Sequence, residues 1–265
     1  MEIKQSQGKI IMFRKLVDRA ILQYKVTTKS DLHIGGHTTV EPAEVDNPVI
    51  KNTEGYPIIP GSSLKGVMRT EVERLLRGLD IKVCDVFDNE SYGGCNECPV
   101  CYLFGGKDLA SSIRIKDAVA DNKKTLIRDS VAIDRQTRKA RDGGKYDIEA
   151  VPRGTIFKGT ITIENTGIES DGYLYDHAKL GGLLGLIDFF NACSGNIGHA
   201  VSRGFGEVEI EIEKLNLITA QDYLDGKYEG SEYSPQTDEY QDLKSNAAAD
   251  WSKYVKEDKH VCQEG

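Results

Sequence analysis

The chain has 265 residues, of which 39% are hydrophobic and 29% charged, so it can bury one sizeable core and is not a disordered polymer. The formal net charge of −8 argues against a uniformly basic protein, but the charge is unevenly spread. Residues 214–265 carry six lysines against eleven acids, whereas residues 107–158 carry thirteen basic residues against eight acids. An acidic tail and a basic middle are therefore separate features.

Two further properties narrow the class of protein. No stretch approaches 18 consecutive apolar residues, and the first residues lack the pattern of a secretory signal, so we expect a cytoplasmic protein with no membrane partner. Four of the six cysteines lie within residues 84–101. This clustering favours a metal site in a reducing compartment over a disulfide framework.

The first half of the chain is predicted to begin with a strand over residues 19–29, followed by a mostly irregular segment over 30–61. A helix follows, with Ser62 or Ser63 as its cap, because apolar residues then recur at spacings of three and four up to Leu79. Next come a cysteine-bearing insertion over residues 80–106 and a strand over 112–118, in which apolar and polar residues alternate.

The second half is predicted to begin with a hairpin over residues 126–150 that turns at 141–144, followed by a strand over 155–164. A helix over 176–193, a glycine-rich loop over 193–206 and a last strand over 207–215 complete it. Without the insertions the order is βαββαβ, which predicts an α+β fold with a ferredoxin-like (RRM-like) core. The expected organisation is a core over residues 1–215 that contains a metal-binding insertion at 80–106 and a hairpin at 120–150. An acidic, partly helical extension follows over residues 216–265.

The cysteines follow the spacing C-x10-C-x2-C-x2-C, which lets four thiolates surround one tetrahedral ion. Structural zinc is the first interpretation, because a metal would stabilise an insertion too small for a core of its own. An iron–sulfur cluster is the alternative. The four ligands are Cys84, Cys95, Cys98 and Cys101.

Two segments have the composition of phosphate-binding sites. In the loop CSGNIGHAVSRGFG, glycines permit close approach of a phosphodiester to Ser202, Arg203 and Gly204. In GSSLKGVMR, Lys65 and Arg69 share a face near a helix N-terminus, which favours an anion. The alternatives are a plain connecting loop and a capped amphipathic helix with solvated charges.

Two residues of the irregular segment, His33 and Asp46, are candidates for acid–base or metal-assisted chemistry. Taken alone, each is more often a turn-forming or hydrogen-bonding residue.

Eight motifs in one order resemble the RAMP superfamily of CRISPR-associated proteins, and most closely the type III effector backbone subunit of the Csm-three or Cas-seven kind. The likeness covers residues 19–213 and rests on DLHIGG, VDNPVIKN, IPGSSLKGVMR, CPVCYLFG, IRIKDA, AIDRQTRKA, PRGTIF and SRGFGEV. It implies a ferredoxin-like core with a thumb hairpin. It also implies filament assembly along CRISPR guide RNA with other copies and other type III subunits, and displacement of every sixth nucleotide of the guide–target duplex.

The resemblance also implies roles for single residues. Asp46 matches the aspartate on which cleavage of target single-stranded RNA depends, in a reaction that needs Mg2+ or another divalent cation and proceeds by attack of the 2′-hydroxyl. Whether Asp46 binds the metal or orients the hydroxyl is open. Positions matching guide contacts, on the core and on the thumb, are His33, Lys51, Ser62, Lys65, Arg69, Ser202, Arg203, Gly204, Arg135, Arg138 and Lys139.

The resulting hypothesis is a guide-RNA-binding backbone subunit that is also a metal-dependent endoribonuclease, cutting target RNA at six-nucleotide intervals at Asp46. Two alternatives stay open. One is a purely architectural guide-binding subunit, and the other is an unrelated ferredoxin-like metalloprotein with a functional four-cysteine site.

Overall fold

The computed structural model describes residues 15–36, 45–85, 94–170 and 172–257. The strands are β1 (Asp18–Thr28), β2 (Ile58–Ile59), β3 (Ile113–Ile115), β4 (Ala118–Ala120), β5 (Leu126–Ile133), β6 (Ala140–Ala150), β7 (Ile156–Glu164), β8 (Ile168–Ser170), β9 (Tyr173–Tyr175), β10 (Val208–Thr219) and β11 (Ser231–Tyr233). The helices are α2 (Gly61–Gly78), α3 (Pro99–Phe104), α4 (Ala178–Ala192), the short 3-10 helix η2 (Val201–Arg203), α5 (Ala220–Leu224) and α6 (Asp238–Glu257).

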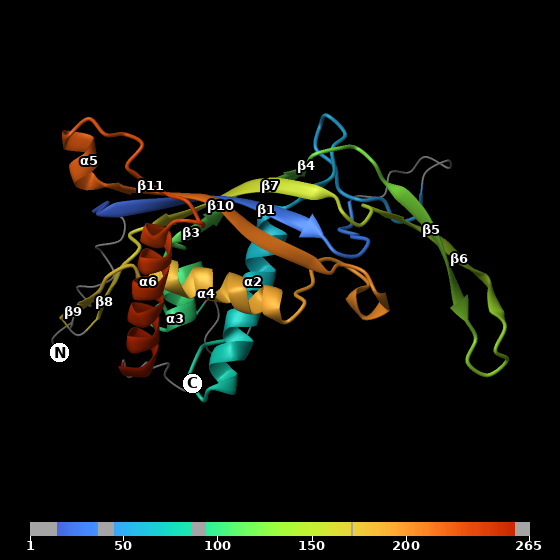
Figure 1. Cartoon of the computed structure of the whole chain (residues 1–265). Coiled ribbons are helices and arrows are strands. Elements are labelled where there is room, and N and C mark those ends of the chain that lie inside the picture. The colour runs from blue at the N-terminus through green and yellow to red at the C-terminus, as the bar shows by residue number, and fades with distance from the viewer. Residues whose placement is uncertain (1–14, 37–44, 86–93, 171, 258–265) are drawn as a thin grey trace.

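One antiparallel sheet forms the centre of the molecule, in the order β11-β10-β1-β7-β4-β2, with β3 also paired to β7. Helices α2, α3, α4 and α6 all lie on one face of it (Figure 1). Strand β1 alternates accordingly: Leu22, Tyr24 and Val26 are buried in the core, while Gln23 is exposed on the other face. The fold is thus a mixed α/β structure whose sheet is covered on one side.

The uncovered face of the sheet is lined by charges that pair across strands. Lys25 on β1 lies 3.1 Å from Glu211 on β10, and Lys158 on β7 lies 3.8 Å from Glu213. Lys29 pairs with Glu209 in the same way. Because acids and bases pair there, the part of this face that the structure describes presents no continuous basic surface for a phosphate backbone.

The outer edge of β10 is covered by two different elements. Strand β11 pairs with it only at Leu215 to Leu217. Further along, the Asn191 amide from the end of α4 accepts from the Ile210 N–H at 2.9 Å and donates to the Ile210 carbonyl at 2.7 Å. Both groups of Ile210 therefore have partners without a neighbouring strand there.

Helix α6 packs against α4 and completes the core with Tyr240, Ala247 and Tyr254. Glycines allow this contact: a Cβ atom on Gly181 would lie 2.0 Å from the carbonyl oxygen of Ala247. The acidic extension predicted after residue 215 therefore includes a helix that belongs to the core, and β10 continues through Leu215 to Thr219.

Replacing Gly181 by Ala should destabilise the protein by about 1–3 kcal/mol, because the methyl group would push the backbones of α4 and α6 apart. Gly185 is the matched control, since it is exposed in the same helix and a Cβ added there would have no atom within 4 Å. Gly185→Ala should stabilise the helix by up to about 1 kcal/mol. Urea unfolding of both variants measures the difference, and equal stabilities would contradict the packing.

Two local predictions are wrong. The hairpin turns at residues 134–139, not at 141–144, because the Asp134 carboxylate accepts from the N–H groups of Gln136 and Thr137 at 2.9 and 2.8 Å. Neither Ser62 nor Ser63 caps α2; the cap position is Pro60, and the Gly61 N–H donates to the Asp117 carboxylate at 2.8 Å. Across the described ranges, no helix is long and apolar enough to span a bilayer.

Candidate functional site

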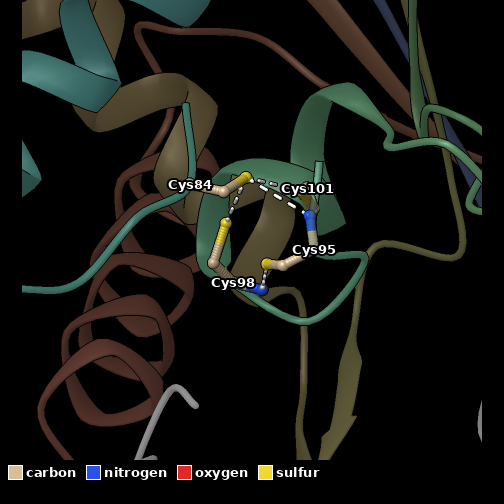
Figure 2. A group of neighbouring side chains, drawn as sticks. All are labelled: Cys84, Cys95, Cys98 and Cys101. Atoms are coloured by element: carbon tan, nitrogen blue, oxygen red, sulfur yellow. Dashed lines mark hydrogen bonds between the residues drawn. The ribbon is translucent and has the colours of Figure 1, made fainter. Parts of the chain in front are cut away.

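The four cysteines of the insertion gather around a common centre, as Figure 2 shows. Their sulfur atoms all lie within 4.8 Å of one another; Cys84 Sγ is 3.4 Å from Cys101 Sγ and 3.8 Å from Cys98 Sγ. Four thiolates bound to one zinc ion at about 2.3 Å would lie about 3.8 Å apart. The cluster is therefore compatible with a structural metal ion, and the predicted grouping of these residues is confirmed.

Local structure explains how distant positions meet in this cluster. Cys98 is the cap residue of α3, and Pro99 occupies the first helical position, so Cys98 and Cys101 lie one turn apart. Gly94 has a φ of 97°, and a Cβ there would lie 3.0 Å from Cys101 Sγ. Hydrogen bonds among the four thiols lower the pKa of Cys95 and raise the pKa of Cys84 and of Cys101, because one thiolate is stabilised by its protonated neighbours.

A second cluster forms where the β5–β6 hairpin leaves the body of the molecule, at the end opposite α5 (Figure 1). The segment carrying Asp46 runs alongside β6: Asn47 N donates to the Asp147 carbonyl at 3.1 Å, and Glu149 N donates to the Asn47 carbonyl at 2.9 Å. Asp46 itself is exposed, and its Oδ2 accepts from Asp147 N at 3.0 Å. The backbone of the hairpin base therefore fixes the position of this carboxylate.

Two further acidic residues lie near Asp46, namely Asp147 on β6 and its cross-strand neighbour Asp129 on β5. Partial burial, a hydrogen bond with Asp129 and the charges of Asp129 and Asp46 raise the pKa of Asp147 above its usual range. Mutual repulsion of this kind is relieved by a proton or by a cation. Carboxylate oxygens are the ligands that Mg2+ prefers, but among the described residues only the cysteine cluster brings three or more ligand atoms close enough together to hold an ion.

Glu149 anchors the Asp46 segment from the other side. Its buried carboxylate accepts from Val49 N at 3.0 Å and from Lys51 Nζ at 2.5 Å. Burial opposes ionisation of Glu149, but hydrogen bonds from Lys51 and Thr125 outweigh it and hold the pKa below its usual range. The charge of Lys51, a predicted guide contact, is thus already balanced within the chain.

His33 joins the same assembly from the loop after β1. Its ring is buried, with Nδ1 2.7 Å from the Glu149 carbonyl oxygen, and it meets the His199 ring edge-on at 6.1 Å. The His33 carbonyl accepts from His199 N at 2.9 Å. His33 therefore joins the hairpin base to the glycine-rich loop.

The glycine-rich loop presents Ser202, Arg203 and Gly204 at the surface. Arg203 is fixed by Tyr146 Oη at 3.0 Å and by His199 Nε2 at 3.1 Å. Neither partner is a carboxylate, so these bonds orient the guanidinium without cancelling its charge. This arrangement suits a phosphate ligand.

The predicted residues of α2 lie in a different setting. Ser62 is exposed in the first turn. Lys65 Nζ donates to Ser111 Oγ at 2.7 Å, and Arg69 pairs with Glu73 and donates to the Gly105 carbonyl at 3.2 Å. Burial and the charge of Arg69 lower the pKa of Lys65. The structure therefore places Lys65 and Arg69 against the cysteine-bearing segment.

The tip of the β5–β6 hairpin carries three exposed basic residues, Arg135, Arg138 and Lys139. The hairpin itself extends well beyond the central sheet (Figure 1). Sequence reasoning missed the residues that join this hairpin to the Asp46 segment, chiefly Asp129, Asp147 and Glu149. One available signal was the polar Glu149 among the apolar residues of the strand end DIEAV.

Comparison with known proteins places the chain in a family. A family model described as the RAMP superfamily matches residues 25–209. The chain is 30% identical over 250 residues to the "CRISPR system Cms endoribonuclease Csm3" of Methanocaldococcus jannaschii, an alignment that covers 89% of this chain and 96% of the relative. A protein of the same name from Methanothermobacter thermautotrophicus is 27% identical over 227 residues, covering 74% and 84%. The chain belongs to the RAMP superfamily and is a Csm3-like subunit of the type III backbone group.

Proposed function

We propose that this protein binds CRISPR guide RNA as a backbone subunit of a type III effector complex in the cytoplasm and cleaves complementary target RNA at Asp46. The observation that carries the proposal is the attachment of the exposed Asp46 carboxylate to the base of the basic hairpin, through Asp147 N and Asn47. The names of the relatives support ribonuclease activity. The proposed partners are guide RNA, target RNA, further copies of the chain and other effector subunits.

In the proposed reaction, a 2′-hydroxyl of the target strand attacks the adjacent phosphorus, and the 5′-oxygen of the next nucleotide leaves. The products are a 2′,3′-cyclic phosphate and a 5′-hydroxyl. The hairpin would serve as the thumb that displaces one target nucleotide in six, which brings its 2′-hydroxyl into line with the leaving oxygen. Asp46, held by Asp147 N, orients the reacting nucleotide.

A divalent cation at Asp46 would stabilise the negative charge that develops on the phosphate. Partial burial, Asp129 and the charge of Asp46 together raise the pKa of Asp147, and a cation beside Asp46 would offset the last of these causes. At the cysteine cluster we propose zinc with a purely structural role.

The fold supports the proposal at a finer level. The sheet order β10-β1-β7-β4, with α2 and α4 on one face, is the arrangement expected for a ferredoxin-like core. The division into a core, a cysteine insertion, a thumb and an acidic extension is proposed on the same basis.

Co-expression with a CRISPR array tests guide binding directly. We expect the purified protein to be oligomeric and to contain uniform repeat-derived RNA, seen in the ratio of ultraviolet absorbance and in sequencing of the RNA. An RNA-free monomer loaded with redox-active iron would contradict the proposal and favour the metalloprotein alternative.

The hairpin tip should contribute to guide affinity through charge. Replacing Arg135 and Lys139 together by Ala should reduce the dependence of log Kd on log salt concentration by about one unit for each phosphate that the hairpin no longer binds. The matched control replaces Arg74 and Lys227 by Ala, because both are exposed and remote from the hairpin. An unchanged slope in the hairpin variant would show that these residues do not bind the RNA backbone.

A further inference from the structure

A cavity of about 510 Å3 lies between the base of the β5–β6 hairpin and the glycine-rich loop. Cavities that bind small molecules measure roughly 300–1,000 Å3, so this one is large enough for a nucleotide. Its apolar wall is formed by Ile148, Ala200 and Phe205, and its polar wall by Arg128, Asp129, Ser130 and Arg203. An apolar wall beside two guanidinium groups suits a ligand that combines a flat ring with an anion.

Arg128 is positioned in this cavity by an aromatic ring and a carboxylate. Its guanidinium carbon lies over the Phe205 ring, 5.0 Å from the ring centre, and its Nε lies 3.4 Å from Asp31 Oδ2. Half of the Arg128 side chain remains exposed. An exposed planar guanidinium is a group on which unpaired nucleobases stack.

Arg203 supplies a fixed positive charge across the cavity. Tyr146 Oη and His199 Nε2 hold its two terminal nitrogens, and neither partner neutralises it with a carboxylate. The phosphate of a nucleotide whose base is stacked in the cavity can therefore bind the oriented guanidinium of Arg203. Ser130 and Asp129 offer hydrogen-bonding groups for the edge of a base.

The cavity adjoins the proposed catalytic carboxylate. Asp129 lines it and is the cross-strand neighbour of Asp147, whose backbone N–H donates to Asp46 Oδ2 at 3.0 Å. A nucleotide that enters the cavity would thus be anchored beside the strand position at which Asp46 acts.

We propose that this cavity binds one unpaired nucleotide, with the base stacked on Arg128 and the phosphate on Arg203. The inference rests on the proposed RNA-binding function and deepens it, because it assigns a receiving site and two residues for a nucleotide outside the duplex. The nucleotide can come from the guide strand or from the target strand, since both offer the same base and phosphate.

The test uses the full-length protein assembled on synthetic guides, each with one abasic site moved a single nucleotide at a time. At the position that occupies the cavity, loss of the base should weaken binding by the wild type on the order of tenfold. In the Arg128→Ala variant the same abasic site should have no further effect. Arg128→Lys should behave like Arg128→Ala, because it keeps the charge but loses the planar surface.

A second series places the abasic sites in the target strand opposite an intact guide. If the loss of affinity caused by an abasic site disappears in the Arg128→Ala variant, in either series, the inference is supported and the strand is identified. Arg74→Ala, an exposed arginine on α2, is the control and should leave the abasic penalty unchanged. If the wild type binds RNA but no abasic site in either strand is coupled to Arg128, the cavity is not a nucleotide site. Failure of the wild type to bind any RNA would instead overturn the proposed function.

Discussion

Replacing Asp46 by Asn is expected to reduce cleavage of target RNA by about 100-fold or more, while guide binding stays at the wild-type level. The amide keeps an oxygen that can accept from Asp147 N, so the segment should remain attached to β6. What is lost is the negative charge that would bind a cation or orient the 2′-hydroxyl. Single-turnover cleavage of a labelled complementary RNA by the assembled complex measures the effect, with bound guide quantified in parallel.

Asp225→Asn is the matched control, because this carboxylate follows α5, at the end of the molecule opposite the hairpin (Figure 1). Its cleavage rate should equal that of the wild type. If Asp46→Asn and Asp46→Ala both cleave normally with guide bound, the catalytic assignment is wrong and the architectural alternative stands.

Replacing Cys98 by Ser is expected to release about one zinc ion per chain and to destabilise the protein by more than about 3 kcal/mol. Cys98 is fully buried, and it connects the cluster to the start of α3. Loss of one ligand would leave an incomplete metal site inside the core. Elemental analysis gives the metal content, and thermal unfolding gives the loss of stability.

Cys193→Ser is the control for this experiment, because Cys193 is exposed at the end of α4. It should retain the metal and the unfolding temperature. Protein prepared without chelators that contains no metal, and whose Cys98→Ser variant unfolds like the wild type, would contradict the structural role. Visible absorption from bound iron would favour the cluster alternative over zinc.

Features encoded by nearby residues were predictable from the sequence. The stripe of Leu64, Met68, Val72 and Leu76 is buried, as the helical spacing predicted. The cysteine cluster followed from ligand spacing in the same way. These predictions succeeded because helical periodicity is set within a few turns of chain and all four ligands lie within residues 84–101.

Features that depend on distant partners were not predictable. The N–H of Gly61, the first residue of α2, donates to the side chain of Asp117, 56 residues away, and Glu149 meets Lys51 across 98 residues. Nothing in a single sequence fixes such pairings before the fold is known.

The hairpin turn was misplaced for a different reason. Its signal is local, because the Asp134 side chain accepts from Gln136 N and Thr137 N, but Gly143 and Gly144 offered a competing turn nearby.

The way the edge of β10 is covered has a consequence for assembly. An open strand edge is a template on which another chain can add a strand, which leads to uncontrolled aggregation. Here a three-residue strand and the Asn191 amide occupy parts of that edge. Many copies held close together on one RNA would therefore be kept from merging into a continuous sheet, and contacts between neighbours are left to other surfaces.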